Sequence, residues 1–392
     1  MARSTSISTS TDTSGPALPP EAWYTALSSF EGMGPATLRR VIDEHPRPED
    51  GWQAVLARRV TPAPGVVALT RQRTETLVTA WAAKAASFDV AGYWRRHGEA
   101  GVGVLLRGTA AYPEVFLDDP DPPALLFHRG DPDVVVGTRV AIVGTRDCTR
   151  YGYDLAFELA RDLSAAGISV VSGLALGIDS AAHAGALDAD LAPPIAVVGS
   201  GLDVIYPRRN GPLWRRVAAA GVVLSEYPLG VAATAWHFPA RNRLIAAIAD
   251  VVVVVESHGK GGALLTVDEA ERRGRPVMAV PGPVRSPASK GCNDLLADNR
   301  PVAVVRDVAD VLVAVGLQSR AHRRATERRQ RPSTADQAVL DAMGWQPATL
   351  DHLLLRTSLS VPELASALVR LESCGWVSPR GGWYERVAKP GG

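Results

Sequence analysis

The chain has 392 residues, 46% of them hydrophobic and 21% charged, with a formal net charge of +1. This length predicts about two to four domains, and the composition is ordinary for a globular protein. Every apolar run falls short of the roughly 20 residues that cross a bilayer. The net charge alone does not indicate nucleic-acid binding, and three scattered cysteines support neither a disulfide framework nor a zinc site. We therefore expect a cytoplasmic protein with no membrane span, whose function must be sought in local patterns.

The first hundred residues predict a leader and a helical domain. Residues 1–20 are rich in Ser, Thr and Pro, lack the apolar segment of a secretory signal and are expected to be disordered. Residues 21–100 have apolar positions three and four apart, broken by Gly and Pro, which predicts an all-α domain. Residues 32–42 match half of a helix-hairpin-helix motif, whose amides can hold a DNA phosphate. An ordinary turn between packed helices is the favoured interpretation, because Gly and Pro punctuate any helical domain.

Residues 101–316 alternate short apolar runs with amphipathic segments. The runs VAIVGT, SVVSGL, PIAVVGS, VVLSEY, DVVVVVES and PVMAVPG are typical of strands that are buried on both faces. The segments between them have the spacing of helices that cover such a sheet. This series predicts an α/β domain with a Rossmann-like parallel sheet and right-handed crossovers. Residues 101–132 are expected to add a pair of strands joined by a Pro-rich connection.

The last part of the chain predicts a linker followed by a winged helix. Residues 317–333 hold six arginines and no apolar stripe, as in a solvated basic linker. Residues 334–388 contain three helical stretches and then a Gly-Gly turn between two strand-like pieces. In the third stretch Leu364, Leu368 and Leu371 share the face expected to be core, and Arg370 lies off it.

Glycines and polar side chains follow the predicted strands, at the edge of the sheet where open α/β folds bind ligands. The residues that we expect at this site are Gly144, Thr145, Arg146, Ser172, Gly173, Arg241, Asn242, Arg243, Lys260 and Gly262. Helix-start amides together with guanidinium groups make an anion site. A cation at the start of a helix weakens that helix unless an anion binds there, and residues 241–243 are expected to precede one. Arg146 and Arg243 are therefore the strongest candidates.

Three further residues lie near this edge, and two of them have two interpretations. Asp179 is expected to cap the helix that carries His183, and a lone helical histidine is more often structural than catalytic. Tyr206 stands next to two arginines and would stack on a single strand, although an aromatic ring that packs under a loop is the commoner case.

The motifs of catalytic α/β proteins are absent from the sequence. It has no GxGxxG after the first strand, no GxSxG elbow and no HExxH pair, and residues 258–262 do not match GxxxxGK[ST]. Paired acids for two-metal chemistry are also lacking near the loops. Amides and guanidinium groups without a nucleophile or a general base predict a binding site with no catalytic residue, metal or cofactor.

Six ordered motifs carry a resemblance to a known family. VAIVGTR, VVSGLALGIDSAAHAGAL, VVGSGLDVIYP, SEYPLG, FPARNRLIA and GALLTVDEAERRGRPVMAVPG resemble those of the DNA-processing protein A (DprA, or Smf) family over residues 104–316. A helical start of the SAM or helix-hairpin-helix kind and a winged-helix end also occur in many members. The resemblance implies a non-enzymatic homodimer that binds and protects incoming single-stranded DNA in natural transformation and loads RecA recombinase onto it.

The same resemblance implies roles for individual residues. Arg146 would hold a phosphate, with the other expected residues around one pocket and Asn293 as an additional lining residue. Many relatives carry lysine where this chain has Leu176, so one phosphate contact is either lost or supplied by Lys260 or Arg150.

Two other functions fit part of the pattern. A phosphoribohydrolase that releases bases from nucleotide monophosphates has a similar sheet, and Glu269 in GKGGALLTVDEA stands near the place of its glutamate. A regulator that binds duplex DNA through the winged helix is the second, although Arg370, Arg380 and Arg386 are sparse for a groove reader. Release of free base would favour the first, and loss of all DNA binding on deletion of residues 333–392 would favour the second.

Overall fold

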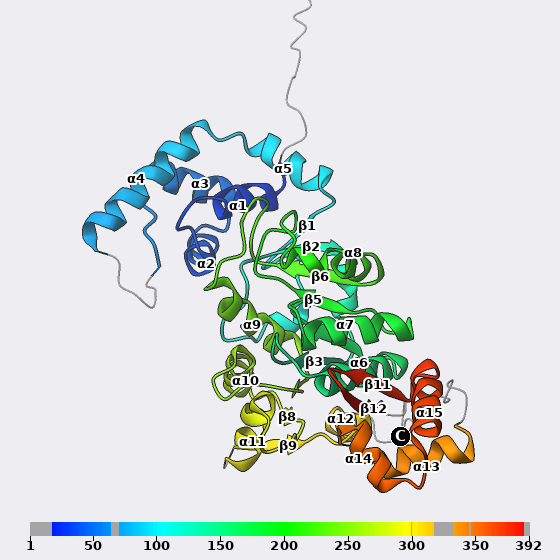
Figure 1. Cartoon of the computed structure of the whole chain (residues 1–392). Helices are drawn as coiled ribbons and strands as arrows, with labels where there is room; N and C mark the ends of the chain where they lie inside the picture. The colour runs from blue at the N-terminus through cyan, green and yellow to red at the C-terminus, as the bar shows by residue number, and fades with distance from the viewer. Residues whose placement is uncertain (1–17, 64–69, 299, 317–331, 345, 388–392) are drawn as a thin grey trace, which may run out of the picture. The chain divides into compact units, whose positions relative to one another are not determined.

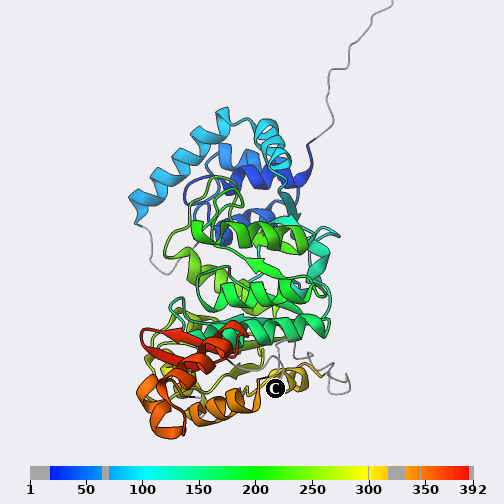
Figure 2. The same cartoon turned by 45° about the vertical axis from the view of Figure 1, so that its right-hand side comes forward.

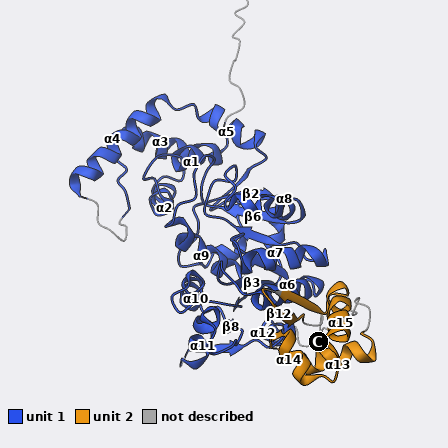
Figure 3. Cartoon of the chain, in the orientation of Figure 1, with its two compact units in different colours: residues 1–317 blue, residues 318–392 orange. Residues whose placement is uncertain are grey.

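The computed structural model describes residues 18–63, 70–298, 300–316, 332–344 and 346–387 (Figure 1). The chain divides into two compact units, Met1–Leu317 and Gln318–Gly392 (Figure 3). The predicted leader, except for its last three residues, and the predicted basic linker, except for its last two, lie outside the described residues. No helix in the described ranges is long and apolar enough to cross a bilayer.

The first unit begins with a helical segment. Its helices are α1 (Pro20–Ser28), α2 (Pro35–Glu44), α3 (Pro48–Leu56), α4 (Arg71–Ser87) and α5 (Val90–Glu99). Three of them start on proline, whose fixed φ suits the first helical position. Thr70 and Asp89 cap the other two, because their side-chain oxygens accept backbone N–H groups of the first turn. Phe30, Trp52 and Phe88 pack together at the centre of this segment.

The described residues form a nine-stranded sheet in the order β1-β2-β6-β5-β4-β3-β7-β8-β9. Its strands are β1 (Gly103–Leu106), β2 (Leu125–Gly130), β3 (Arg139–Val143), β4 (Ser169–Ser172), β5 (Ile195–Val197), β6 (Val222–Ser225), β7 (Val251–Val254), β8 (Val277–Ala279) and β9 (Val302–Val304). The strands from β3 to β9 are parallel, whereas β1 and β2 pair antiparallel with each other and β2 pairs antiparallel with β6. The predicted α/β fold and its added pair of strands are thus confirmed, and the complete sheet is mixed.

Helices cover both faces of the sheet (Figures 1 and 2). They are α6 (Arg150–Ala165), α7 (Ile178–Ala189), α8 (Gly211–Ala220), α9 (His237–Ile248), α10 (Gly262–Arg272), α11 (Lys290–Ala297) and α12 (Val308–Ala314). Short 3-10 turns lie at Glu114–Phe116, Pro132–Val135, Arg208–Asn210 and Pro287–Ser289. Successive residues of a strand point to opposite faces, so Val140 and Ile142 pack with α6 and α7. Ala141 and Val143 pack with α9 and α10 in a second apolar cluster.

The second unit has the winged-helix order that the sequence predicts. It contains α13 (Thr334–Met343), α14 (Leu350–Arg356), α15 (Val361–Ser373), β10 (Ala348–Thr349), β11 (Val377–Arg380) and β12 (Trp383–Arg386). Leu364, Leu368 and Leu371 are buried in its core, as expected. Arg370 lies off that face and forms an ion pair with Asp336 at 2.7 Å.

Candidate nucleic-acid interface

A pocket lies at the carboxyl ends of β3, β4 and β5, the edge where open α/β sheets bind ligands. Its lining residues are Arg146, Gly173, Ala175, Leu176, Val198, Gly199, Ser200, Tyr206, Pro207, Ala233, Phe238 and Arg241. Three of the predicted site residues, Arg146, Gly173 and Arg241, are therefore brought together.

Arg241 is a buried cation in the wall of this pocket, with only 5% of the residue exposed. Its Nη1 donates to the carbonyl oxygens of Gly173, at 2.7 Å, and Val197. A Cβ at Gly173 would overlap the guanidinium group, so any larger residue there would displace the Arg241 side chain. Burial lowers the pKa of Arg241, against the opposing effect of Asp179, and the nearby charge of Arg146 lowers it further. An anion in the pocket would relieve both effects.

The Nε group of Arg241 has no hydrogen-bond partner among the described residues. A buried donor without a partner costs free energy, which a ligand that accepts this hydrogen bond would recover. No carboxylate of the described chain comes within ion-pair distance of this guanidinium group. Arg241 is thus available to an anion on grounds of both charge and hydrogen bonding.

Arg146 is an exposed cation at the same pocket. Its guanidinium carbon lies 4.6 Å from the centre of the Phe238 ring, within the range of a cation–π contact. The Phe238 ring is in turn 5.5 Å from that of Tyr206. The described residues offer Arg146 no carboxylate partner. A positive charge next to two aromatic rings is the combination that binds a phosphate and its neighbouring base.

The ends of β3 and β4 next to the pocket are fixed by Gly144, Thr145 and Ser172. The Thr145 N–H donates to the Glu256 carbonyl at 2.8 Å, and the Ser172 hydroxyl donates to the Ile142 carbonyl at 2.7 Å. A Cβ on Gly144 would lie 2.5 Å from a carbon of Ile178, so only glycine fits there. These residues hold the loops after β3 and β4 in place.

Asp179 holds the loop after β4 instead of capping α7. Its Oδ2 accepts the N–H groups of Gly173 at 3.2 Å and Ala175 at 3.4 Å. The N-cap position is Gly177, whose φ of 76° favours glycine, so the predicted capping role is wrong. His183, one turn further along α7, is fully buried, and burial together with the positive charge of Arg241 lowers its pKa to about 4. Such a neutral, buried ring agrees with the structural interpretation.

Comparison with known proteins decides the family. A sequence profile described as DNA recombination-mediator protein A matches residues 103–316, and one for the DprA winged helix domain matches residues 323–382. The chain belongs to the DNA recombination-mediator protein A family. It is 28% identical to Protein Smf of Synechocystis over 403 residues, which cover 93% of this chain and 98% of that protein.

Two solved DprA structures are similar to this chain. That of Streptococcus pneumoniae DprA is 28% identical, covers 75% of this chain and 96% of its own, and gives a TM-score of 0.60. That of Helicobacter pylori DprA, whose study concerns its single-stranded DNA binding mode, is 30% identical, covers 55% and 95% of the two chains and gives a TM-score of 0.50. The resemblance to the DprA family predicted from six motifs is confirmed.

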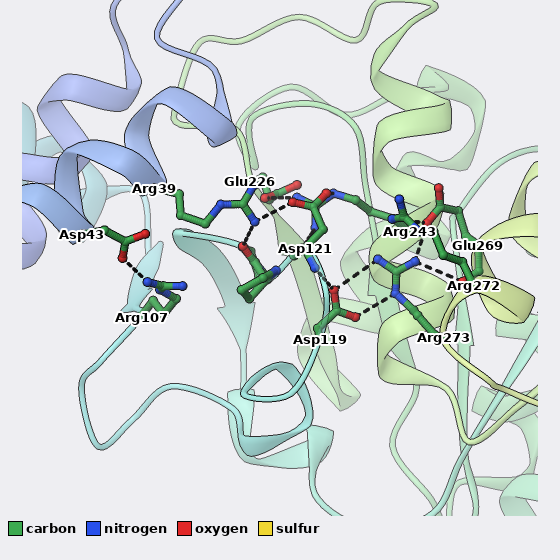
Figure 4. Close-up of polar contacts among 12 residues, drawn as sticks. Arg39, Asp43, Arg107, Asp119, Asp121, Glu226, Arg243, Glu269, Arg272 and Arg273 are labelled. Atoms are coloured by element: carbon green, nitrogen blue, oxygen red, sulfur yellow. Dashed lines mark hydrogen bonds and ion pairs between the residues drawn. The ribbon is translucent and has the colours of Figure 1, made fainter. Parts of the chain in front are cut away.

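Arg243, one of the two strongest candidates from the sequence, lies outside the pocket of this DprA family member. Its guanidinium group is paired with the buried Glu226 and with Asp121, 3.3 Å away, and donates to the Asp121 carbonyl at 2.6 Å (Figure 4). The argument from the sequence was wrong on two points. Helix α9 begins at His237, so residues 241–243 lie within the helix, and the cation has a folding role through its carboxylate partners.

The remaining predicted residues do not line the pocket. The Asn242 side chain donates to the Gly262 carbonyl at 3.3 Å, which joins α9 to the start of α10. The Asn293 amide both donates to and accepts from the backbone of Gly282, at 3.0 and 3.1 Å. Lys260 is exposed on the loop before α10. In the described structure Asn242 and Asn293 thus have local structural partners.

The structure adds pocket residues that the sequence did not single out, above all Phe238 and Ala233, and it places Leu176 in the same lining. Phe238 is the first residue of the FPARN motif. It lies in the first turn of α9 and lines the pocket from there. Leu176 lines the pocket as an apolar side chain, so it offers no charge to a phosphate at this point. Arg150, suggested as the substitute contact, pairs with Asp154 at 2.8 Å.

In the described ranges, no group of three or more His, Cys, Asp or Glu residues gathers as metal ligands. Glu269, the glutamate of the phosphoribohydrolase alternative, is occupied by ion pairs with Arg272, at 2.8 Å, and Arg273. These ion pairs give the Glu269 carboxylate a structural role at the end of α10.

Proposed function

We propose that this chain binds single-stranded DNA at the pocket around Arg146 and Arg241, and that it does so without catalysing a reaction on the strand. The observation that carries the proposal is the Arg241 guanidinium group, which is buried at the carboxyl edge of the sheet with an unpartnered N–H. Asp179 offsets part of the cost of burying this cation although it lies beyond ion-pair distance, and a bound anion would offset the rest. The DNA phosphate is that anion.

The two arginines contact a phosphate from different positions in the pocket. Arg241 is fixed by its bonds to the Gly173 and Val197 carbonyls and presents charge from the wall of the pocket. Arg146 is exposed, so it adds charge at the mouth of the pocket and closes over the bound group. Gly144, Thr145 and Ser172 hold the loops after β3 and β4 in the conformation that places the two arginines.

The aromatic rings supply the preference for single strands. Tyr206 and Phe238 offer π-faces on which any base stacks, which gives binding without sequence specificity. In a duplex the base faces are already stacked on each other, so the same rings gain nothing. The proposal therefore predicts tighter binding of a single strand than of a duplex.

The biological setting follows from the family. We propose that the bound strand is incoming or recombining DNA in the cytoplasm, that the protein protects it and delivers it to RecA recombinase, and that the protein acts as a homodimer. Family membership and the DprA relatives support this setting. The lack of known catalytic motifs in the sequence, and of a metal-ligand group among the described residues, supports a non-enzymatic role.

Binding of a fluorescent single-stranded oligonucleotide tests the proposal, with a duplex of the same sequence as comparison. We expect the wild type to prefer the single strand and Arg146→Ala to weaken binding by about tenfold or more, because a charge-assisted contact to phosphate is lost. Arg71→Ala is the matched control, since it removes the same charge from an exposed pair with Glu75 on α4. Equal affinities for single strand and duplex, or equal losses in the two variants, would overturn the proposal.

A further inference from the structure

A second cavity, of about 390 Å³, lies within the first unit between the helical segment and the sheet. One wall is the turn at residues 28–35 with the start of α2, and the other is the segment at residues 226–237 after β6. Its volume falls in the range typical of small-ligand sites. Phe30, Met33 and Leu38 contribute apolar side chains to it. The function proposed above uses none of these residues.

Ion pairs join the two walls of this cavity (Figure 4). Arg39 of α2 pairs with Asp121 at 2.5 Å and donates to the Pro122 carbonyl at 3.0 Å. Asp121 is also bound by Arg243, which holds Glu226 at the start of the second wall. Because charged residues from α2, the loop before β2, α9 and the segment after β6 meet in one cluster, the cavity exists before any ligand arrives.

Aromatic rings form the second wall. The Tyr227 and His237 rings are stacked with centroids 3.9 Å apart, and the Trp236 ring stands edge-on to His237 at 4.0 Å. Trp236 nevertheless has 64% of its surface exposed, although tryptophan side chains are highly buried on average. An exposed tryptophan next to a preformed cavity supplies a face on which a planar ring can stack.

The second wall is also a wall of the pocket around Arg146 and Arg241. Ala233 and Phe238 line that pocket, whereas Thr234, Trp236 and His237 line the second cavity. Neighbouring Cα atoms are about 3.8 Å apart, so a single stretch of backbone separates the pocket from the second cavity. The His237 ring bridges them, because its Nδ1 donates to the carbonyl of Gly199, a residue of the first pocket, at 2.9 Å.

We propose that the second cavity receives a base of the same DNA strand whose phosphate is held by Arg146 and Arg241, with Trp236 as the stacking platform. This inference rests on the proposed function and extends it to a second site. Continuity with the phosphate pocket selects a DNA base as the occupant, and the aromatic wall suits any base. The helical segment thereby becomes part of the DNA site, because Phe30, Met33 and Leu38 close the cavity from its side.

Oligonucleotides with and without bases separate the two sites. The probes are a fluorescent oligothymidylate and a matched strand in which abasic residues replace all nucleotides but the labelled end. We expect Trp236→Ala to weaken binding of the oligothymidylate by about tenfold, because stacking of one base on an aromatic ring contributes about 1–3 kcal/mol. Binding of the abasic strand is expected to stay unchanged in that variant, whereas Arg146→Ala weakens both.

Two control variants make the result specific. Trp236→Phe keeps an aromatic face and is expected to recover most of the lost affinity, and Trp383→Ala removes another exposed tryptophan, on β12, without effect. Circular dichroism checks that each variant is folded, which the exposure of Trp236 favours. If Trp236→Ala binds both probes as tightly as the wild type while Arg146→Ala loses both, the base site is wrong and the proposed function stands. If the wild type shows no single-strand preference, the proposed function itself fails.

Discussion

Two groups of arginines in the first unit differ in their partners. At the carboxyl edge of the sheet, Arg146 and Arg241 face a pocket without a carboxylate at ion-pair distance among the described residues. Around the loop before β2, Arg39, Arg243 and Arg273 each have a carboxylate partner (Figure 4). The arginines of the first group can therefore pair with an anionic ligand, whereas those of the second group form ion pairs that stabilise the fold.

Helix α9 carries one member of each group, two residues apart. Positions i and i+2 of a helix do not share a face, so Arg241 and Arg243 reach different surroundings. Burial lowers the pKa of both groups, but for Arg243 the charges of Glu226 and Asp121 outweigh that effect and raise its pKa. The comparison shows that the role of an arginine in this fold is decided by the acids that the tertiary structure brings to it.

The largest effect on stability is expected from breaking the paired group. Glu226→Ala would leave the buried Arg243 with Asp121 as its remaining carboxylate, and removing one partner of a buried pair costs about 3–5 kcal/mol. We expect the free energy of unfolding, measured in urea, to fall by about 3 kcal/mol because Asp121 compensates in part. Glu75→Ala, which breaks an exposed pair on α4, is the control and should leave it unchanged. Equal stability of the two variants would mean that the cluster does not stabilise the fold.

Arg241, which has no carboxylate at ion-pair distance in the described chain, affects how stability depends on pH. Burial and the positive charge of Arg241 together lower the pKa of His183 and keep its ring neutral. The pKa of His183 is lowered to about 4 in the folded protein, so the unfolded chain binds the proton more readily below pH 6.5. Stability is therefore lost as pH falls from about 6.5 toward 4, by about 2 kcal/mol between pH 7 and pH 5.

Urea unfolding of the wild type and of His183→Gln at these two pH values measures that difference. Glutamine does not titrate, so the variant should show a smaller loss between pH 7 and pH 5, whatever its stability at pH 7. An identical loss in both proteins would show that other groups account for the acid sensitivity.

Most of the fold was predictable from local patterns. The apolar runs marked β3 to β8, and the spacing of Leu364, Leu368 and Leu371 marked the core helix of the second unit. Strand β9 was missed because its three residues at the sheet edge are only partly buried or exposed, so its pattern resembles a loop. The start of α9 was also missed, since Trp236 provides no side-chain cap to announce it.

The candidate site was predictable only in part. Gly173, Arg146 and Arg241 follow strands or lie in motifs that the sequence displays, and they do line one pocket. The partners of Arg243 come from residues 17 and 122 positions away in the chain, so no local pattern could reveal them. The second cavity likewise depends on how the helical segment packs against the loop after β6, which periodicity does not encode.

The smallest effect is expected for the stability of Arg146→Ala. Arg146 is exposed and its main contact is with the Phe238 ring, and an exposed cation–π pair contributes about 0.5–1 kcal/mol. The free energy of unfolding should therefore change by less than about 1 kcal/mol, against the larger loss in Glu226→Ala, in the same urea experiment. A fall as large as that of Glu226→Ala would place Arg146 with the structural arginines, and its effect on DNA binding would then report on folding. A small change in the free energy of unfolding would instead show that Arg146→Ala keeps the fold. Its loss of DNA binding would then be due to the missing contact in the pocket.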